Sequence, residues 1–543
     1  MIFKLWPALK AIFKKFHLDY LTVFILVIIV FANIQGSYTL PEPDSFYHAK
    51  IVKFLSEGKI LHQFPWLQET ALAQQFVDHH FLYHLLLVPF VIFDDPLVGV
   101  KLAAIIFTGL AGLIVYWFLK KFGCRWPLVY ILVLLLSRDW LWRASLVKAP
   151  VVFLIFTVLA YYFLIEKKWL NLFLISFFSV WLYGGWPVIL ALAGIYFFAS
   201  RLLSGLAAEA PLKQKIKIFF GLKNGPVPPT PRFAERGRVL GPLIVLFGQL
   251  AGLVINPYFP ANLNFFWVQT VKIALINYHD IIRVGNEWYP YTPFNIITNE
   301  PLVAALLMVG TLLLILNFKK LSVHSLTWGI ISFIFLLLSL KSRRNIEFFV
   351  PFTVIFFALA ISDYLKEFSR SEIAGIFKGK TTGILGVILA VFILAHLFRV
   401  PWDMLTVKRD ILVGSPINRY QEAAAWLKAN TPERSVVFHS DWDDFPFLFY
   451  YNDHNYYITG LDHTFMYEHD RQKFKLYESI INGQETQDLD KKIKEQFKAV
   501  YVFAKNSYQR FNENLRANAN FERVYIDKEA AIYKIKDDVQ KSD

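Results

Sequence analysis

Acidic residues just beyond apolar segments are the first candidates for chemistry, because a carboxylate there can act at a membrane surface. Asp44 comes shortly after the apolar run 20–34. In a helix that begins here and continues to about Glu57, Asp44, Tyr47 and His48 share one face, because residues i, i+3 and i+4 are neighbours. Asp44 can then be a helix N-cap, or it can meet a charged headgroup at the water–lipid boundary. The residues themselves leave both interpretations open.

Other candidate residues lie in later segments between apolar runs. The acids are Asp78, Asp139 and Glu287, and the bases are Arg143, Lys148, Arg343 and Arg344. Carboxylates can hold a divalent cation such as Mg²⁺ or Mn²⁺ against phosphate oxygens, and Arg or Lys can compensate the remaining negative charge. Together these residue types predict a site for a lipid phosphate or pyrophosphate. The candidate metal ligands are Asp44, Asp78 and Asp139.

Each candidate also has a structural explanation. The two neighbouring arginines can contact lipid headgroups, and Glu287 can be a solvated loop acid. Asp139 can pair with Arg138 or Arg143, and the histidine pair at 79–80 is typical of hydrogen bonding rather than metal ligation. The residue types alone do not choose between these explanations and the phosphate site.

The composition predicts a polytopic α-helical membrane protein. Of the 543 residues, 56% are hydrophobic and only 18% are charged, against about 25% charged in soluble domains. The net charge of +14 is explained by basic loops that face the cytoplasm, so we expect no nucleic-acid partner. The single Cys124 excludes an internal disulfide and a cysteine-based metal cluster. The first apolar run lacks a small-residue cleavage site, so we expect it to remain as an anchor.

The distribution of Lys and Arg predicts the topology. By the positive-inside rule the basic amino-terminal segment is cytoplasmic and residues 37–96 form an outer loop. The apolar segment Phe81–Phe93 is short and contains Pro89, so we expect it not to cross the membrane. Further spans are expected at about 97–118, 124–138, 149–165, 169–184, 186–203, 239–256, 300–317, 323–340, 346–364 and 383–399.

This count of about eleven spans divides the chain into two predicted domains. Residues 1–402 form the transmembrane domain, with a cytoplasmic loop at 201–238 and a second outer loop at 257–300. Residues 403–543 form a small extracytoplasmic α/β domain. Its predicted elements are a helix at Gln421–Asn430, strands at Ser435–His439, Lys498–Phe503, Phe521–Ile526 and Ala530–Ile535, and a helix near Ser507–Leu515.

Short motifs along the chain carry a family resemblance. They are Glu42–Lys50 (EPDSFYHAK), Ser137–Arg138, Trp181–Trp186 (WLYGGW) and Ser440–Phe445 (SDWDDF). In this order they resemble the GT-C superfamily of polyprenyl-linked-sugar glycosyltransferases, in particular the catalytic subunit of oligosaccharyltransferase. The resemblance implies a metal-dependent transferase with a polyprenyl-linked sugar donor and a protein or glycan acceptor.

The resemblance also implies roles for individual residues. Asp44 matches the family's metal-binding, acceptor-side aspartate, and Glu287 resembles the glutamate of its mobile loop. Arg343 or Arg344 resembles the arginine near the lipid phosphate. The acceptor-binding pair is Trp442 and Asp443, where Asp441 replaces the first Trp of the family's Trp-Trp-Asp motif, and Ser145 and Lys148 stand near the place of the family's further acids.

Three functions compete to explain these features. A glycosyltransferase at the outer face of the plasma membrane explains why acids and bases gather at one membrane edge. A transporter or flippase of lipid-linked sugars predicts inverted repeats and ionisable groups near mid-membrane, and neither is evident. A non-catalytic, membrane-anchored binding protein leaves the charges of the outer loops unexplained. The sequence therefore favours the transferase.

Overall fold

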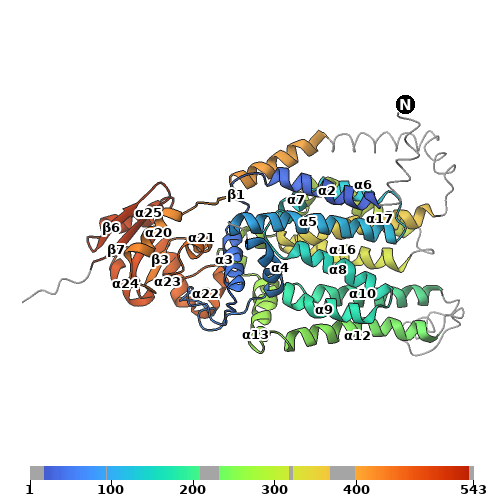
Figure 1. Ribbon diagram of the computed structural model, residues 1–543, viewed down its shortest axis with the longest axis horizontal. Helices are drawn as coiled ribbons and strands as arrows, with labels where there is room; N and C mark the ends of the chain where they lie inside the picture. Colours follow the sequence, from blue (N-terminus) through green and yellow to red (C-terminus); the bar gives the residue numbers. More distant parts are fainter. Residues whose placement is uncertain (1–16, 93–94, 208–231, 317–321, 367–397, 537–543) are drawn as a thin grey trace, which may run out of the picture. The chain divides into compact units, whose positions relative to one another are not determined.

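The computed structural model describes residues 17–92, 95–207, 232–316, 322–366 and 398–536 (Figure 1). The chain divides into two compact units, each built from three separate stretches of sequence. The helical unit comprises Met1–Gly36, Ala104–Asn256 and Tyr289–Ile411. The α/β unit comprises Ser37–Ala103, Pro257–Trp288 and Leu412–Asp543.

In the helical unit, many helices begin at a proline, a residue that favours the first position of a helix. Its principal helices are α2 (Leu18–Ile34), α5 (Pro96–Lys121), α6 (Pro127–Leu135), α7 (Arg138–Ala144), α8 (Pro150–Ile165), α9 (Trp169–Leu182), α10 (Pro187–Ala207), α12 (Arg232–Val254), α14 (Pro293–Asn299), α15 (Pro301–Leu316), α16 (Val323–Lys341) and α17 (Ile346–Leu365). Six of them begin with proline, which suits the first helical position because its missing N–H has no intrahelical partner there.

Helices α9 and α12 pack closely because α12 carries two glycines one turn apart. A Cβ atom at Gly248 would lie 2.7 Å from the carbonyl oxygen of Phe173, and one at Gly252 would lie 2.5 Å from that of Phe177. Small residues at i and i+4 allow two membrane helices to approach backbone to backbone. Figure 1 shows α8, α9, α10 and α12 side by side within the helical unit.

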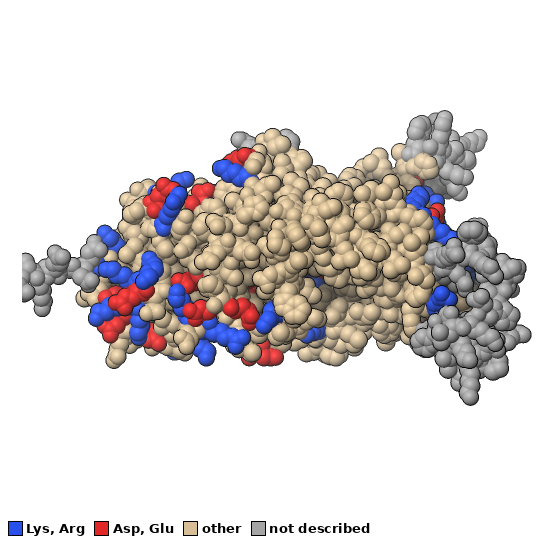
Figure 2. Space-filling view, turned by 90° about the horizontal axis from the view of Figure 1, so that it is seen from below, with Lys and Arg blue, Asp and Glu red and all other residues tan. Residues whose placement is uncertain are grey.

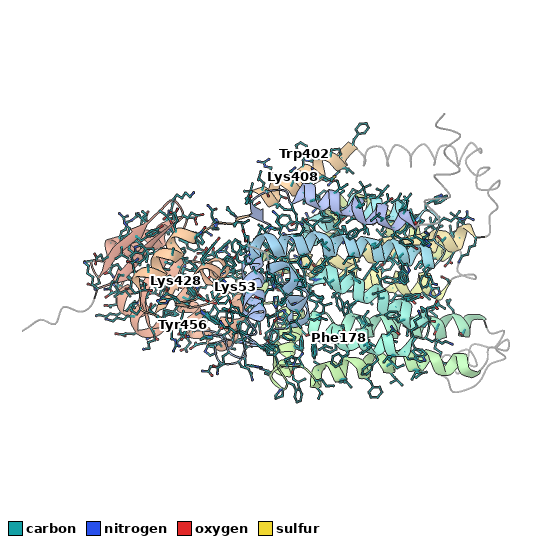
Figure 3. All side chains as sticks on the ribbon, in the orientation of Figure 1. Lys53, Phe178, Trp402, Lys408, Lys428 and Tyr456 are labelled. Carbon is teal, nitrogen blue, oxygen red and sulfur yellow. The ribbon has the colours of Figure 1, made fainter. Side chains whose placement is uncertain are left out.

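The outer surface of these helices is apolar. On α9 the exposed large hydrophobic side chains are Leu170, Leu174 and Phe178, spaced four residues apart and therefore on one stripe. Phe178 projects from α9 in Figure 3. Figure 2 shows that on the drawn face the flank of the helical unit is nearly free of charged side chains. Such a surface fits contact with lipid.

Among the described residues, four helices are long and apolar enough to cross a membrane: α5, α10 over Pro187–Ser204, α16, and Arg343–Leu365. A fifth is possible if α14 and α15, which are bent by 106°, form one broken span. Other predicted spans coincide with shorter apolar helices, namely α2, α8, α9 and the Val239–Val254 part of α12. The predicted span 383–399 lies almost entirely outside the described residues, so the total of about eleven remains a prediction.

Two sequence expectations need correction here. The predicted span 124–138 corresponds to α6, which is only nine residues long and is followed by the separate helix α7. The predicted loop 201–238 is helical at both ends, because α10 continues to Ala207 and α12 already begins at Arg232. Its remaining residues lie outside the described part of the chain.

The α/β unit is organised around a five-stranded sheet with the order β4-β3-β5-β7-β6. The strands are β3 (Val436–His439), β4 (Tyr456–Tyr457), β5 (Ala499–Lys505), β6 (Phe521–Ile526) and β7 (Ala530–Ile535). β3 pairs in parallel with β4 and β5, and β7 pairs antiparallel with β5 and β6. Helices α20 (Gln421–Asn430) and α25 (Gln509–Ala517) confirm the two helices expected in this region.

Two earlier stretches of sequence complete the α/β unit. Helices α3 (Asp44–Ser56) and α4 (Phe81–Val91) pack against each other, and α3 also packs on α21 (Phe445–Tyr451). The backbone N–H groups of Gln68 and Glu69 donate to the carbonyls of Tyr457 and Ile458 at 2.9 and 3.0 Å. The unit therefore depends on contacts between residues almost four hundred positions apart.

Candidate active site

Asp44 is the first residue of α3, and Pro43 occupies the N-cap position. The expectation that Asp44 itself is the N-cap is therefore wrong by one residue. A negative charge in the first turn is still favoured by the helix dipole. The predicted helix from Asp44 to about Glu57 is confirmed, because α3 ends at Ser56.

A buried chain of hydrogen bonds connects α3 to α4. Nδ1 of His84 lies 2.7 Å from Oδ2 of Asp78, and Nε2 of His84 lies 2.7 Å from Nδ1 of His48. A carboxylate can only accept, so Nδ1 of His84 carries a proton, and in neutral His84 the Nε2 atom accepts from His48. Asp78 also accepts the backbone N–H of His80 at 3.0 Å. Asp78, a predicted metal ligand, thus orients His84, and His84 in turn bonds to His48, which lies one turn after Asp44 on α3. His84 was not among the residues that the sequence pointed to.

A second acidic cluster lies in the same unit after β3. Asp441 accepts the N–H of Asp443 and lies 3.3 Å from Nζ of Lys505, which is also 3.9 Å from Asp444. Burial raises the pKa of Asp443 to about 7, with further contributions from the charges of Asp441 and Asp44. Burial and the charge of Asp441 raise the pKa of Asp444 to about 8. Asp44 and Asp443 are therefore electrostatic neighbours.

Trp442 lies between Asp441 and Asp443 in the sequence and is buried, with 8% of its surface exposed. Its indole N–H has no acceptor among the described residues, and its ring lies 5.2 Å from the ring of His463. A buried N–H without a partner is costly, so it is suited to bind an acceptor atom of a ligand. The side chain thus has the burial and the free donor expected of a binding residue.

The segment that carries Glu287 lies beside Trp442. A Cβ atom at Gly285 would lie 3.7 Å from Cη2 of Trp442 and 3.7 Å from Cδ1 of Trp288. Glu287 follows in a short 3₁₀ turn, Asn286–Trp288, and is half-buried. Two pairs of predicted residues therefore lie near each other in the α/β unit. Asp44 is near Asp443, and the segment that carries Glu287 is near Trp442.

The helical unit gathers several of the predicted cations. Arg143 of α7 donates from Nε and Nη2 to Oε2 of Glu347 at 2.9 and 2.6 Å, and both side chains are buried. The hydroxyl of Tyr183 lies 3.5 Å from Oε1 of Glu347 and accepts from Nη2 of Arg344 at 3.3 Å. Tyr183 belongs to the WLYGGW motif. One network therefore connects that motif with two of the predicted phosphate-binding arginines.

The remaining candidates of the helical unit lie around a second group of contacts. The hydroxyl of Tyr291 donates to Oδ2 of Asp139 at 2.6 Å, and the backbone N–H of Asp139 donates to Glu300 at 2.8 Å. The guanidinium of Arg343 lies 5.6 Å from the centre of the Tyr291 ring. Lys148 is half-buried between α7 and α8. Asp139 thus has hydrogen bonds to Tyr291 and Glu300, and the charge of Arg138 also acts on its carboxylate.

A divalent cation has no multidentate protein site in the described part of the chain. No three side chains among its His, Cys, Asp and Glu residues are arranged to hold a metal ion. Asp44 and Asp78 belong to the α/β unit, and Asp139 belongs to the helical unit. The three predicted ligands therefore do not form a cage within either unit.

Comparison with known proteins identifies the fold. No protein-family model and no curated protein sequence matches the chain. The oligosaccharyltransferase of Archaeoglobus fulgidus in its apo form matches with a TM-score of 0.62 and 12% identity, over 90% of this chain and 70% of that chain. AglB of the same organism, in complex with an inhibitory peptide and a dolichol-phosphate, matches with a TM-score of 0.62 and 13% identity, over 94% and 73%.

A third similar structure comes from a different organism. ArnT from Cupriavidus metallidurans, bound to undecaprenyl phosphate, matches with a TM-score of 0.51 and 14% identity, over 96% of this chain and 98% of that chain. At sequence identities of 12% to 14%, these similarities show a shared fold and nothing finer. The chain therefore has the fold of the GT-C glycosyltransferases and resembles the oligosaccharyltransferases among them, as its motifs predict.

Proposed function

We propose that this chain is a glycosyltransferase of the plasma membrane that moves a sugar or an oligosaccharide from a polyprenyl phosphate or pyrophosphate to a protein or glycan acceptor. The observation that carries the proposal is the electrostatic neighbourhood of Asp44 and Asp443 in one unit, next to the buried, unpartnered indole of Trp442. The shared fold over nine-tenths of the chain supports the same class of reaction.

In the proposed reaction the acceptor loses a proton, its atom bonds to the sugar, and the sugar–phosphate bond breaks. Asp44 takes the proton as general base, with Glu287 as the second catalytic carboxylate. Trp442 and Asp443 bind the acceptor. Charge then develops on the departing phosphate, and arginine and lysine side chains stabilise it. Arg344 and Arg343 are the main phosphate-binding residues, and Arg143 and Lys148 are the further ones.

The proposal includes a divalent cation, Mg²⁺ or Mn²⁺, as cofactor. Mg²⁺ is commonly held by one or two carboxylates together with the phosphates of a substrate, so Asp44 could hold it with the donor, and Asp78 and Asp139 are its other predicted ligands. The cation would neutralise phosphate charge. No step above relies on it, because the described residues form no three-ligand site.

The function is tested by transfer from a radiolabelled polyprenyl-linked sugar in membranes that contain the protein. We expect label to move from the lipid fraction to an acceptor, to stop on addition of EDTA, and to return with Mg²⁺ or Mn²⁺. Membranes that contain the protein but only translocate the labelled lipid would show a flippase instead. Transfer that continues undiminished in EDTA would remove the metal from the proposal.

Trp442 is expected to set the affinity for the acceptor. Trp442→Phe keeps an aromatic ring but removes the indole N–H, and a lost hydrogen bond of about 0.5–1.5 kcal/mol raises KM for the acceptor roughly three- to tenfold. The matched control is Trp426→Phe, since Trp426 packs on Tyr525 in the same unit. Acceptor titrations compare the two variants, and equal KM values in both would contradict the binding role.

The proposed orientation places the amino terminus in the cytoplasm and residues 403–543 outside. The basis is the inside placement of basic loops, including the one that contains Lys120, Lys121 and Arg125. A protease added to intact spheroplasts should then cleave within residues 403–543, as seen on an immunoblot. Protection of this segment until the cells are lysed would invert the proposed topology.

A further inference from the structure

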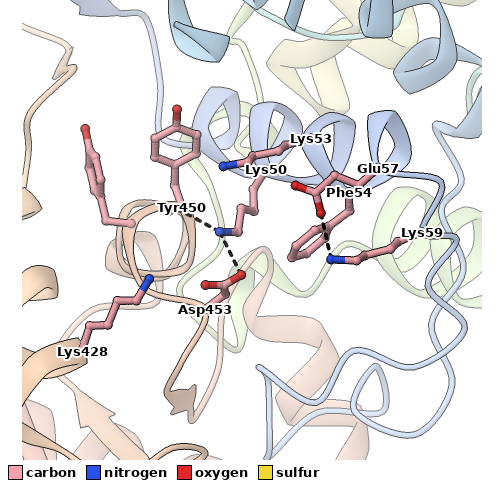
Figure 4. A pocket seen from close by; sticks show the side chains of 9 residues that line it. Lys50, Lys53, Phe54, Glu57, Lys59, Lys428, Tyr450 and Asp453 are labelled. Atoms are coloured by element: carbon pink, nitrogen blue, oxygen red, sulfur yellow. Dashed lines mark hydrogen bonds and ion pairs between the residues drawn. The ribbon is translucent and has the colours of Figure 1, made fainter. Parts of the chain in front are cut away.

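The α/β unit contains a cavity of about 480 Å³ that the proposed transfer reaction does not use (Figure 4). Its charged lining consists of four lysines and two carboxylates: Lys50, Lys53, Lys59, Lys428, Glu57 and Asp453. Lys53 and Lys428 come from α3 and α20, and both are labelled in Figure 3. The cavity is formed where α3 meets the start of the C-terminal stretch.

Lys50 forms the inner wall of this cavity. Its side chain is 92% buried, since only 8% is exposed, and Nζ lies 3.1 Å from Oδ2 of Asp453 and donates to the carbonyl of Tyr450 at 3.2 Å. Figure 4 draws both contacts. Nζ also lies 5.4 Å from the centre of the Phe54 ring. Asp453, the carbonyl of Tyr450 and the ring of Phe54 together hold the Lys50 ammonium group in place.

The mouth of the cavity carries unbalanced positive charge. Lys59 pairs with Glu57 at 2.8 Å, and Lys50 pairs with Asp453. Lys53 and Lys428 are exposed and have no ion-pair partner among the described residues. Burial lowers the pKa of Lys50, Asp453 opposes this, and the like charges of Lys53 and Lys428 lower it further. The two unpaired lysines therefore repel Lys50, and an anion bound in the cavity would reduce this repulsion between like charges.

Hydrogen-bond donors at the cavity also suit an anion. The hydroxyl of Tyr450 has no hydrogen-bond partner among the described residues, and burial raises its pKa, so it remains a neutral donor. The hydroxyl of Tyr451 already donates to the carbonyl of Ile417. Lys53 and Lys428 are thus the two free donors that line the cavity, whereas the Tyr450 hydroxyl points away from Lys50 in Figure 4 and lies near the charge of Asp95.

The cavity is separate from the proposed transfer site. Lys53 follows Asp44 by nine residues on α3, and at about 100° per residue this is half a turn of difference in direction. The face with His48 packs against α4, whereas the face with Phe46 and Lys50 packs against α21 and its neighbours. The same helix therefore presents a carboxylate on one side and a basic cavity on the other.

We propose that this cavity is a binding site for a phosphate group that carries hydroxyl groups, such as a sugar phosphate or a polyol phosphate headgroup. Lysine is a common ligand of phosphate, which its ammonium group binds as a compact point charge. Glu57 and Asp453 can accept from sugar hydroxyls, and Phe54 offers an apolar surface. The volume admits a phosphorylated monosaccharide.

The test uses the full-length protein in nanodiscs and radiolabelled glucose 1-phosphate in equilibrium dialysis. We expect one saturable site that Lys53→Gln/Lys428→Gln weakens about tenfold or more, since two unit charges near the anion are lost. The matched control, Lys475→Gln/Lys528→Gln, removes two exposed lysines of the same unit away from the cavity and should change the affinity less than twofold.

The lipid composition of the nanodiscs distinguishes the two sources of the phosphate. If a phosphatidylglycerol headgroup is the natural occupant, discs that contain this lipid should reduce glucose 1-phosphate binding relative to phosphatidylcholine discs. If a soluble sugar phosphate is the occupant, both discs should give the same affinity. The proposal is overturned if glucose 1-phosphate shows no saturable binding in phosphatidylcholine discs, or if the Lys53/Lys428 variant binds as well as the control. Asp44→Asn should leave this binding unchanged, which separates the cavity from the transfer reaction.

Discussion

Transfer from a polyprenyl-linked donor is expected to fall about a hundred- to ten-thousandfold when Asp44 is replaced by Asn. Asn has nearly the same shape as Asp, but it cannot take a proton from the acceptor. Asp44 lies in the first turn of α3, so the change also removes a favourable charge–dipole interaction of about 0.3–1 kcal/mol. That affects stability and not the rate. Initial rates at saturating acceptor, together with a melting curve, separate the two effects.

A matched control for Asp44→Asn is available in the same unit. Asp470 is the N-cap of α23 (Arg471–Ile481) and accepts from the N–H groups of Gln472 and Lys473. Because Asn caps a helix as well as Asp does, Asp470→Asn should leave the transfer rate within about twofold. If Asp44→Asn lowers the rate less than about tenfold, Asp44 has only a structural role and the general base lies elsewhere.

The second large effect is expected at the ion pair between Arg143 and Glu347. Arg143→Met leaves a buried carboxylate without its cation, which costs about 3–5 kcal/mol. The double variant Arg143→Met/Glu347→Leu removes both charges and should recover most of that loss. Tyr183 contacts both Glu347 and Arg344, so the single variant should also reduce transfer. Thermal unfolding of the purified protein and transfer rates measure the two consequences.

An exposed ion pair of similar length provides the comparison. Lys492 lies 2.6 Å from Glu485, and both are about one-third exposed. Lys492→Met should therefore cost less than about 1 kcal/mol. Equal losses for Lys492→Met and Arg143→Met would show that the Arg143 network contributes nothing beyond a surface pair.

Local sequence patterns predicted the elements of the C-terminal region well. The helix Gln421–Asn430 and the strands Phe521–Ile526 and Ala530–Ile535 occur at the predicted residues. These segments have a clear period of 3.6 or 2 residues and are bounded by turn residues, so local information is sufficient. The helix that follows Asp44 was predicted for a similar reason, although its N-cap is Pro43 and not Asp44.

Partners that are distant in sequence were not predictable from the same patterns. His84 lies 36 residues from His48, and Glu347 lies 204 residues from Arg143. The local periodicity of the sequence does not indicate such pairs, and a single His or Glu within an apolar helix does not reveal its partner. The grouping of the first outer loop with the C-terminal residues was missed as well, because hydrophobic runs define helices but not which loops pack together.

The discontinuity of the α/β unit determines when it can fold. The strand pair Thr39–Leu40 and Ser415–Pro416 and the bridge between Leu67 and Tyr457 each join an early residue to a late one. During synthesis, α3 and α4 are therefore translated long before the residues that cover them. A ribosome adds about 5–20 residues per second. Helices α3 and α4 and the segment between them therefore exist for tens of seconds before the residues that cover Phe46 and Phe64 are made. Until then Phe46 lacks its contact with Phe447 and Phe64 lacks Phe449, and residues 412–543 produced alone would lack the same packing partners.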